Sequence, residues 1–318
     1  MKARILTIAA LATTFASVLP AVDPHLLALV MPDANVLAGV NVASAKSTPF
    51  GQFVLSQLAP KDQEFQKMAV LTGFDPRQDL IELLAASTGV TGSHAGLAMA
   101  TGTFNTSAIL AAATSSGAIT ETYNGATIIE DPKAKTPSGI AFLGSTIAVA
   151  GDLADVKAAI DRQSAPPAIN ANLAAQAKSL SASQDAWVAS IIGPPPLEAP
   201  AGVGAGKGTG LPLNALQQIV SGNAGVKFGT NVVVTAQAQA DNAQDATNLA
   251  GMLQLLANMA AMQSDKSPQA AALAKGLTVS ASGTTVNISF TLPEDQLQQM
   301  MSSHPNAVKK PAGSMPKK

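Results

Sequence analysis

Three hairpin signals constrain the fold of this chain more than any other feature of its sequence. Each is a short turn between strand-like runs, and the turns lie at Asn124-Gly125, at Gly144-Ser145 and near Ser282-Gly283. Turns of this kind join neighbouring strands that run in opposite directions. The run NVVVTAQAQA at 231–240 alternates between two faces and predicts a half-buried strand. With further strands predicted at 36–42, 96–104 and 187–192, antiparallel sheet is expected in both halves.

Helices are predicted where a capping residue or a proline precedes an apolar stripe. Their starts are Thr48-Pro49, Asp75-Pro76, Thr106, Asp152, Pro212, Asp241 and a Thr291/Glu294 capping box. The helix after Asp75-Pro76 is expected to carry Leu80, Ile81, Leu83 and Leu84 on its stripe. The helix after Pro212 is expected to end at Gly222.

The order of these elements is similar in the two halves: strand, proline-started helix, strand, helix, hairpin, helix. We therefore predict an α+β fold of two related modules, each a mainly antiparallel sheet with helices packed on one face. The first module covers 22–164 and the second 165–300. A Pro- and Ala-rich crossing near 164–182 separates them.

The N-terminus resembles a secretory signal peptide over residues 1–21. Lys2 and Arg4 precede the uncharged run 5–19, and Ala21 provides a small residue at a cleavage point. We therefore expect an exported protein, periplasmic or secreted. The alternative is an uncleaved N-terminal membrane anchor, because Leu19 is large for the −3 position. The C-terminal stretch 301–318 is predicted to be a disordered basic tail.

Composition excludes several classes of function. Charged residues make up 12% of the 318 residues and the formal net charge is −1, which gives no basic field for nucleic acid. The chain has no cysteine, so disulfides, thiolate metal sites and a cysteine nucleophile are excluded. No cofactor is expected.

Three segments give the chain a resemblance to uncharacterised exported bacterial proteins that contain a domain of unknown function. They are MPDANVLAGVNV with the Pro-Phe helix after it, GFDPRQDL at 73–80, and the closing LTVSASGTTVNISFTLPEDQL. The likeness covers most of 27–300. It implies an α+β fold outside the cytoplasm and brings no catalytic residues with it.

No constellation of catalytic side chains emerges. The histidines His25, His94 and His304 lack the spacing of a zinc site. Ser93 beside His94 lacks the context of a hydrolase nucleophile. The pairs Asp75/Asp79 and Asp152/Asp155 are explained by helix capping. An enzyme, most plausibly a hydrolase, is therefore the least supported class.

The string GAGKGTG within the Gly/Pro-rich segment 193–211 resembles a phosphate-binding loop. The motif requires glycine where Ala201 stands, and three prolines separate it from the preceding strand. Gly208, Gly210 and Pro212 delay the following helix, so its N-terminus would not meet an anion. We expect no nucleotide, and we interpret the segment as a flexible insertion between a strand and a helix.

The helix 242–262 carries an apolar stripe that includes two methionines. Its members Leu249, Met252, Leu253, Leu256 and Met259 either pack into an ordinary core or line a groove for an apolar, lipid-like ligand. The sequence thus favours an exported, non-enzymatic binding or structural module with a protein partner or self-association. A carrier of an apolar small molecule is the alternative.

Overall fold

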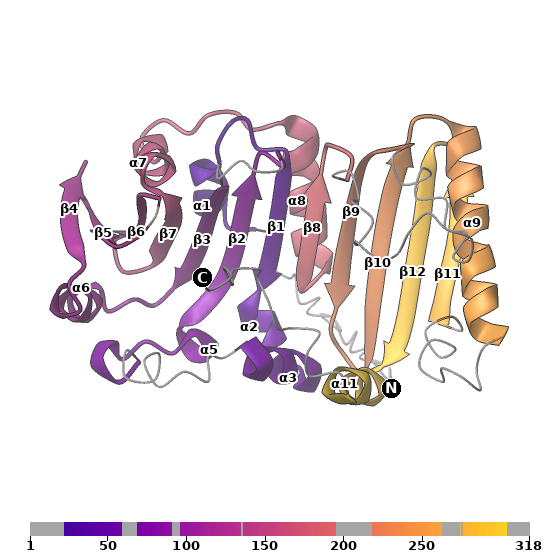
Figure 1. The fold of residues 1–318 in the computed structure, drawn as a ribbon, viewed down its shortest axis with the longest axis horizontal. Helices are drawn as coiled ribbons and strands as arrows, with labels where there is room; N and C mark the ends of the chain where they lie inside the picture. Colours follow the sequence, from indigo (N-terminus) through magenta and orange to yellow (C-terminus); the bar gives the residue numbers. More distant parts are fainter. Residues whose placement is uncertain are drawn as a thin grey trace, which may run out of the picture.

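The computed structural model describes residues 22–58, 69–90, 96–134, 136–194, 218–262, 274 and 276–303 (Figure 1). Within this part of the chain, twelve strands form one sheet in the order β11-β12-β10-β9-β8-β1-β2-β3-β7-β6-β5-β4, and every neighbouring pair is antiparallel. The predicted α+β class with antiparallel sheet is confirmed.

The strands lie in both halves of the chain. They are β1 (Val36–Asn41), β2 (Leu80–Ser87), β3 (Gly96–Gly102), β4 (Ile119–Tyr123), β5 (Ala126–Glu130), β6 (Ser138–Leu143), β7 (Ile147–Asp152), β8 (Ala186–Ser190), β9 (Ile219–Lys227), β10 (Asn231–Ala240), β11 (Leu277–Ser282) and β12 (Thr285–Pro293).

The helices connect and cover these strands. They are α1 (Pro24–Leu29), α2 (Val42–Ala45), α3 (Pro49–Leu58), α5 (Pro76–Asp79), α6 (Thr106–Ser115), α7 (Leu153–Arg162), α8 (Ala171–Ser183), α9 (Ala243–Met262) and α11 (Glu294–Ser303). Among the described helices, none has the length and apolar character needed to cross a membrane.

The three hairpins are confirmed, although the β11–β12 turn is Gly283-Thr284 rather than Ser282-Gly283 and the β6–β7 turn has three residues, 144–146. β4 and β5 join through Asn124 (φ 46°) and Gly125 (φ 83°), so both turn residues adopt the positive φ that a type I′ turn requires. Gly144 and Gly283 also have positive φ, at the turns of β6–β7 and β11–β12.

One predicted helix is wrong, and a second is wrong over its last three residues. The helix after Asp75-Pro76 is a single turn, α5, and the apolar run that follows it is β2. The helix expected over 213–221 meets β9 at Ile219, and Gly222 lies inside that strand. Residues 212–217 lie outside the described part of the chain.

Three further local predictions need correction. The expected crossing near 164–182 contains the helix α8, which Asn170 caps by accepting hydrogen bonds from Asn172 N and Leu173 N. The start of α9 is capped by Asn242, whose Oδ1 accepts from Asp245 N, rather than by Asp241. Thr291 belongs to β12, and Glu294 N donates to the carbonyl of Thr230, so no capping box forms there.

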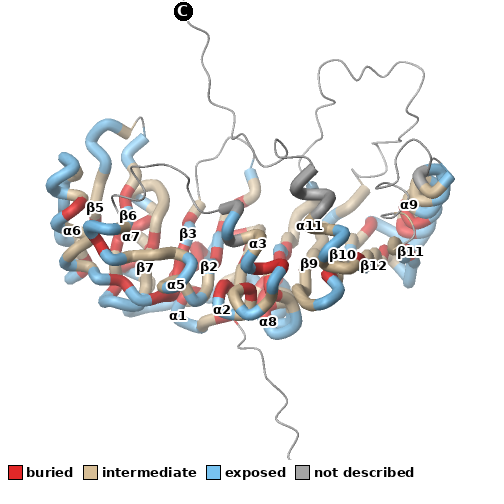
Figure 2. Tube along the Cα trace, turned by 90° about the horizontal axis from the view of Figure 1, so that it is seen from below, coloured by how far each residue is buried: buried red, intermediate tan, exposed pale blue. Residues whose placement is uncertain are grey.

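Two hydrophobic cores lie on opposite faces of the sheet. On one face α1, α7 and α8 pack on the strands of the first half and on β8, around Leu37, Leu84 and Trp187. On the other face α9 packs on β10, β12 and β11, around Val279 and Val286. Figure 2 shows α8 and α9 on opposite sides of the sheet. The expectation of helices on one face is therefore wrong for the second half, which has α8 on one face and α9 on the other.

The two halves of the chain meet inside this sheet. β1 pairs with β8 in a continuous antiparallel register from Val36↔Ser190 to Val40↔Ala186. The strands β1 to β7 lie on one side of this seam and β8 to β12 on the other. The halves therefore share one sheet.

Candidate interaction face of the sheet

The middle of the sheet has one face that the packed helices leave uncovered. Side chains of successive residues in a strand point to opposite faces, so the register assigns each residue to a face. The face opposite Leu37, Leu84 and Trp187 is here called the open face. Its residues are Gly222, Ala224 and Val226 of β9, Ala186, Val188 and Ser190 of β8, Val36, Ala38 and Val40 of β1, Leu83, Ala85 and Ser87 of β2, and Gly96, Ala98 and Ala100 of β3.

The open face is apolar and uncharged, and it is accessible over much of its area, although Ala100 at its β3 side is buried. Leu83 and Val188 are each 38% exposed, and Ala85 and Ala98 are also exposed. Serine hydroxyls provide its polar groups, and none of its residues is charged. On the opposite face of the same strands, Leu37, Leu84, Met99 and Ala189 are buried at 2% exposure or less. The strands are thus apolar on both faces, but helices cover only one.

Two hollows extend this face. The larger, with a volume of about 530 Å³, lies at the end of the seam between the halves, and its lining includes Val36, Val188, Ile192 and Ile219. The smaller, of about 450 Å³, lies over β7, β6 and β5 and includes Ile140 together with Glu130, Asp131 and Asp152. The larger hollow is uncharged along its lining, whereas the smaller one carries carboxylates.

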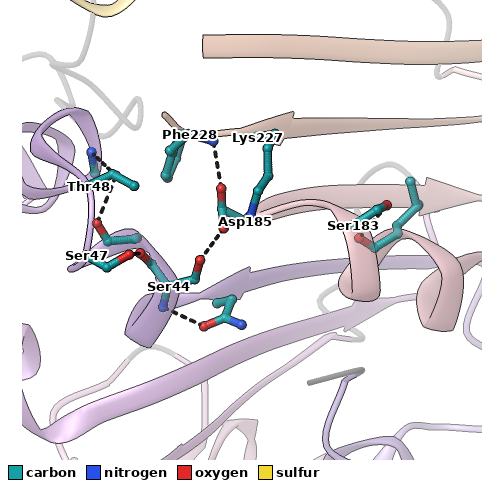
Figure 3. Close-up of polar contacts among 11 residues, drawn as sticks. Ser44, Ser47, Thr48, Ser183, Asp185, Lys227 and Phe228 are labelled. Carbon is teal, nitrogen blue, oxygen red and sulfur yellow. Dashed lines mark hydrogen bonds and ion pairs between the residues drawn. The ribbon is translucent and has the colours of Figure 1, made fainter. Parts of the chain in front are cut away.

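A buried aspartate fixes the seam from the other side of the sheet (Figure 3). Asp185, 0% exposed, precedes β8 and accepts hydrogen bonds from Ser44 Oγ of α2, from Lys227 Nζ at 2.8 Å and from Phe228 N at 2.6 Å. Its backbone joins the same elements, because Asn41 N donates to the Asp185 carbonyl and Asp185 N donates to that of Val226. Asp185 therefore ties β1 and α2 of the first half to β9 of the second.

The Ser44–Asp185–Lys227 arrangement does not form a nucleophile and base. Ser44 donates its proton to a carboxylate that Lys227 also engages, so that oxygen is already paired, and the second oxygen binds Phe228 N. Neither of the two hollows above is lined by these residues. Its contacts make the cluster a structural connection.

The stripe residues of α9 divide between core and surface. Leu249 is buried, and Met252 and Leu253 pack against the second core beside it. Leu256 is half-buried, and Met259 is 49% exposed. Neither of the two hollows is lined by a residue of α9.

The other sequence candidates do not converge on one site. His25 is exposed on α1, while Ser93, His94 and His304 lie outside the described residues. Asp75 is the N-cap of α5, and its hydrogen bonds with the Arg77 side chain lower the pKa of this carboxyl to about 2. Asp75 N also donates to Asp79 Oδ2.

The remaining candidates can be placed only in part. Asp152 occupies the N-cap position of α7 without a side-chain cap bond, and Asp155 lies in the first turn. The string GAGKGTG lies outside the described residues, as do the segments 1–21 and 304–318. No group of three or more potential metal ligands occurs in the part of the chain that the structure describes.

The sequence alone did not reveal the open face, because the predicted helices covered the first part of β2 and the first three residues of β9. In LIELLAAS both alternating faces are largely apolar, which fits a central strand but gives no period that separates a strand from a buried helix.

Comparisons with known proteins found no relative of this chain. No model of a protein family, no curated protein and no solved structure matches the chain.

Proposed function

We propose that this chain is an exported, non-enzymatic interaction module that binds an uncharged, apolar surface of another protein or of a second copy on its open face. The observation that carries the proposal is the unbroken, uncharged face across β9, β8, β1, β2 and β3, with Leu83 and Val188 each 38% exposed.

The energetics of apolar surface support a binding role for this face. Contiguous exposed apolar surface is uncommon on monomeric proteins and marks sites of interaction. Covering it releases about 25 cal/mol for each Å² removed from water. Because the open face has no charge, its partner is recognised by shape and apolar contact rather than by ion pairs.

Export is supported by the basic start of the chain and the short apolar run that follows. A non-enzymatic role is supported by the polar cluster around Asp185, in which both carboxylate oxygens already accept hydrogen bonds from other residues of the chain.

The strand order supports a relation between the two halves. From the seam outward, the first half runs β1-β2-β3-β7-β6 and the second runs β8-β9-β10-β12-β11. In both halves three consecutive strands are followed by the last strand of the half and then by its hairpin partner. We infer two related modules, with β4 and β5 as an addition to the first.

A carrier of an apolar small molecule is the second candidate. The hollow of about 530 Å³ at the seam supports it, because this volume suits a small ligand and its lining is uncharged. In this alternative the ligand lies on the open face rather than along α9.

Site-directed photo-crosslinking of the mature protein in its own cell envelope tests the proposal. A photoreactive phenylalanine derivative replaces Val188 on the open face in one variant and Leu255 in the matched control. Leu255 is 59% exposed on α9 and is not part of the open face. We expect a protein adduct, either a partner or a second copy, from position 188 and none from position 255.

Two results would count against this role. Equal adducts from both positions would indicate non-specific contact. A lipid retained by the purified protein in native mass spectrometry and displaced by Val188→Asp, with no protein adduct, would favour the carrier instead.

A further inference from the structure

We propose that the mature chain begins at Val22 and that its new α-ammonium group is held inside the fold between Ser181 and Glu82. The inference rests on the proposed export, and it assigns the peptide bond between residues 21 and 22 as the processing site.

Val22 is a member of the larger hydrophobic core. Val22 is 4% exposed, and Leu26, Leu29 and Val30 that follow are buried in the same core. The first residues of a domain are usually poorly ordered unless specific contacts hold them. Val22 therefore belongs to the packed core, and it directly follows the position where the signal-peptide pattern ends.

The backbone nitrogen of Val22 has a prepared acceptor. It donates to Ser181 Oγ of α8 at 2.8 Å, and Ser181 is itself buried. The Ser181 hydroxyl donates in turn to the carbonyl of Lys178 at 3.2 Å, so its lone pairs face Val22. An ammonium at this position would keep the hydrogen bond and gain two further N–H donors.

A carboxylate lies next to the same nitrogen. Glu82 of β2 is on the covered face of the sheet, and its Oε2 accepts from Asp23 N at 3.0 Å. Adjacent backbone nitrogens are separated by three covalent bonds, so Val22 N lies within roughly 7 Å of this oxygen. A charge of opposite sign at such a distance stabilises a half-buried carboxylate. Among the described residues, no cation is hydrogen-bonded or ion-paired with Glu82.

The chemical step is hydrolysis by a leader peptidase. Water adds across the peptide bond between residues 21 and 22, the carbonyl carbon of Ala21 leaves as a carboxylate, and the nitrogen stays on Val22. That nitrogen takes up a proton and becomes the α-ammonium. Because Val22 is buried in the folded chain, cleavage has to precede folding.

The test uses the full chain, expressed with its leader and recovered after export. N-terminal sequencing and intact mass are expected to give a chain that starts at Val22. Amine-reactive labelling then compares the native and the urea-unfolded protein. Labelling of the Val22 nitrogen is expected to be at least about tenfold slower in the native state, as for other groups that react only after opening. Lys133, which is exposed, serves as the internal control with equal rates.

Two variants separate the ion pair from simple burial. Glu82→Gln keeps the shape of the side chain but removes its charge, and Ser181→Ala removes the acceptor. Each is expected to speed labelling of Val22 in the native protein several-fold while the chain stays folded by circular dichroism.

The possible failures differ from one another. An exported chain that starts elsewhere, or a Val22 nitrogen labelled equally fast in both states, would overturn the buried terminus while leaving export intact. A chain that keeps its leader and stays inside the cell would overturn the proposed export as well.

Discussion

Trp187 of β8 occupies the space that a side chain at Gly39 of β1 would need. The two residues pair directly across the seam, and a methyl group on Gly39 would lie 2.4 Å from Cε2 of the indole. The tight fit of the seam therefore depends on the absence of a side chain at this glycine.

Gly39→Ala should lower the free energy of unfolding by about 1 to 3 kcal/mol, the usual cost of overpacking a core. Gly251 is the matched control, because it is exposed within α9 and a methyl group there meets nothing within 4 Å. Gly251→Ala should stabilise the protein by up to about 1 kcal/mol through helix propensity. Urea unfolding followed by circular dichroism measures both changes, and equal effects would contradict the packing at Gly39.

Asp185→Asn should destabilise the protein by about 3 kcal/mol, because it breaks a buried charge network. Ser44→Ala alone should cost about 1 kcal/mol, the value of one hydrogen bond. In the double variant the loss at Ser44 should largely vanish, since the two residues share one contact. Fully additive losses in urea unfolding would show that Ser44 acts independently of Asp185.

The burial of Glu82 predicts that stability depends on pH, and that this dependence differs between the chain with and without the residues before Val22. In a chain that retains residues before Val22, burial raises the pKa of Glu82 from 4.5 to about 7, and repulsion from Asp23 adds to the shift. The native state then binds this proton more tightly than the unfolded state, so stability is lost as the pH rises from 4.5 to about 7. Because the group is only half-buried, we expect a loss of about 1 to 2 kcal/mol.

Unfolding measured across this pH range, with Glu82→Gln as the control, tests the assignment. The variant should show no such fall. In the mature chain that starts at Val22, the α-ammonium should favour the carboxylate and reduce or remove the fall. A fall of equal size in the mature chain would argue against contact between the ammonium and Glu82.

The stripe of α9 offers a paired truncation. Leu249→Ala should cost about 2 to 4 kcal/mol because Leu249 is buried, whereas Met259→Ala should change stability by less than about 0.5 kcal/mol. Thermal unfolding compares them. A bound lipid that disappears on Met259→Ala would instead support the groove along this helix.

The hairpins could be predicted because a local signal determines each of them. Asn124 and Gly125 adopt the positive φ values that these residue types tolerate, so the turn and its register follow from neighbouring residues. The alternation in β10 is equally local. Antiparallel sheet in both halves could therefore be predicted from short windows of sequence.

β2 and β9 could not be predicted in this way. In β2, Leu84 faces a core while Ile81 and Leu83 face the open side, and a run that is apolar on both faces has no clear period. In β9, Gly222 approaches the backbone of β10, and a methyl group there would lie 2.8 Å from the Gln237 carbonyl oxygen. The glycine is needed for this close approach to a distant strand, whereas in the sequence alone it is typical of a residue that ends a helix.

The candidate face and the seam depend on contacts that no short window contains. Asp185 and Ser44 are 141 residues apart, and the open face becomes visible only when five strands are placed in register. The predicted stripe of α9, by contrast, was a local pattern, and its buried end lies in the core.

The pairing of β1 with β8 also imposes an order on folding. As the chain emerges from its N-terminus, β1 can pair with β2 early, but its other edge stays without a partner until residues 186–190 arrive. Bringing β1 and β8 together closes a loop that spans residues 42–185, which is slow. Until then the unpaired edge of β1 is a template for aggregation. A chain that crosses a membrane unfolded would thus need protection for β1 during this interval, and completion of the seam would be the step after which β1 no longer has a free edge.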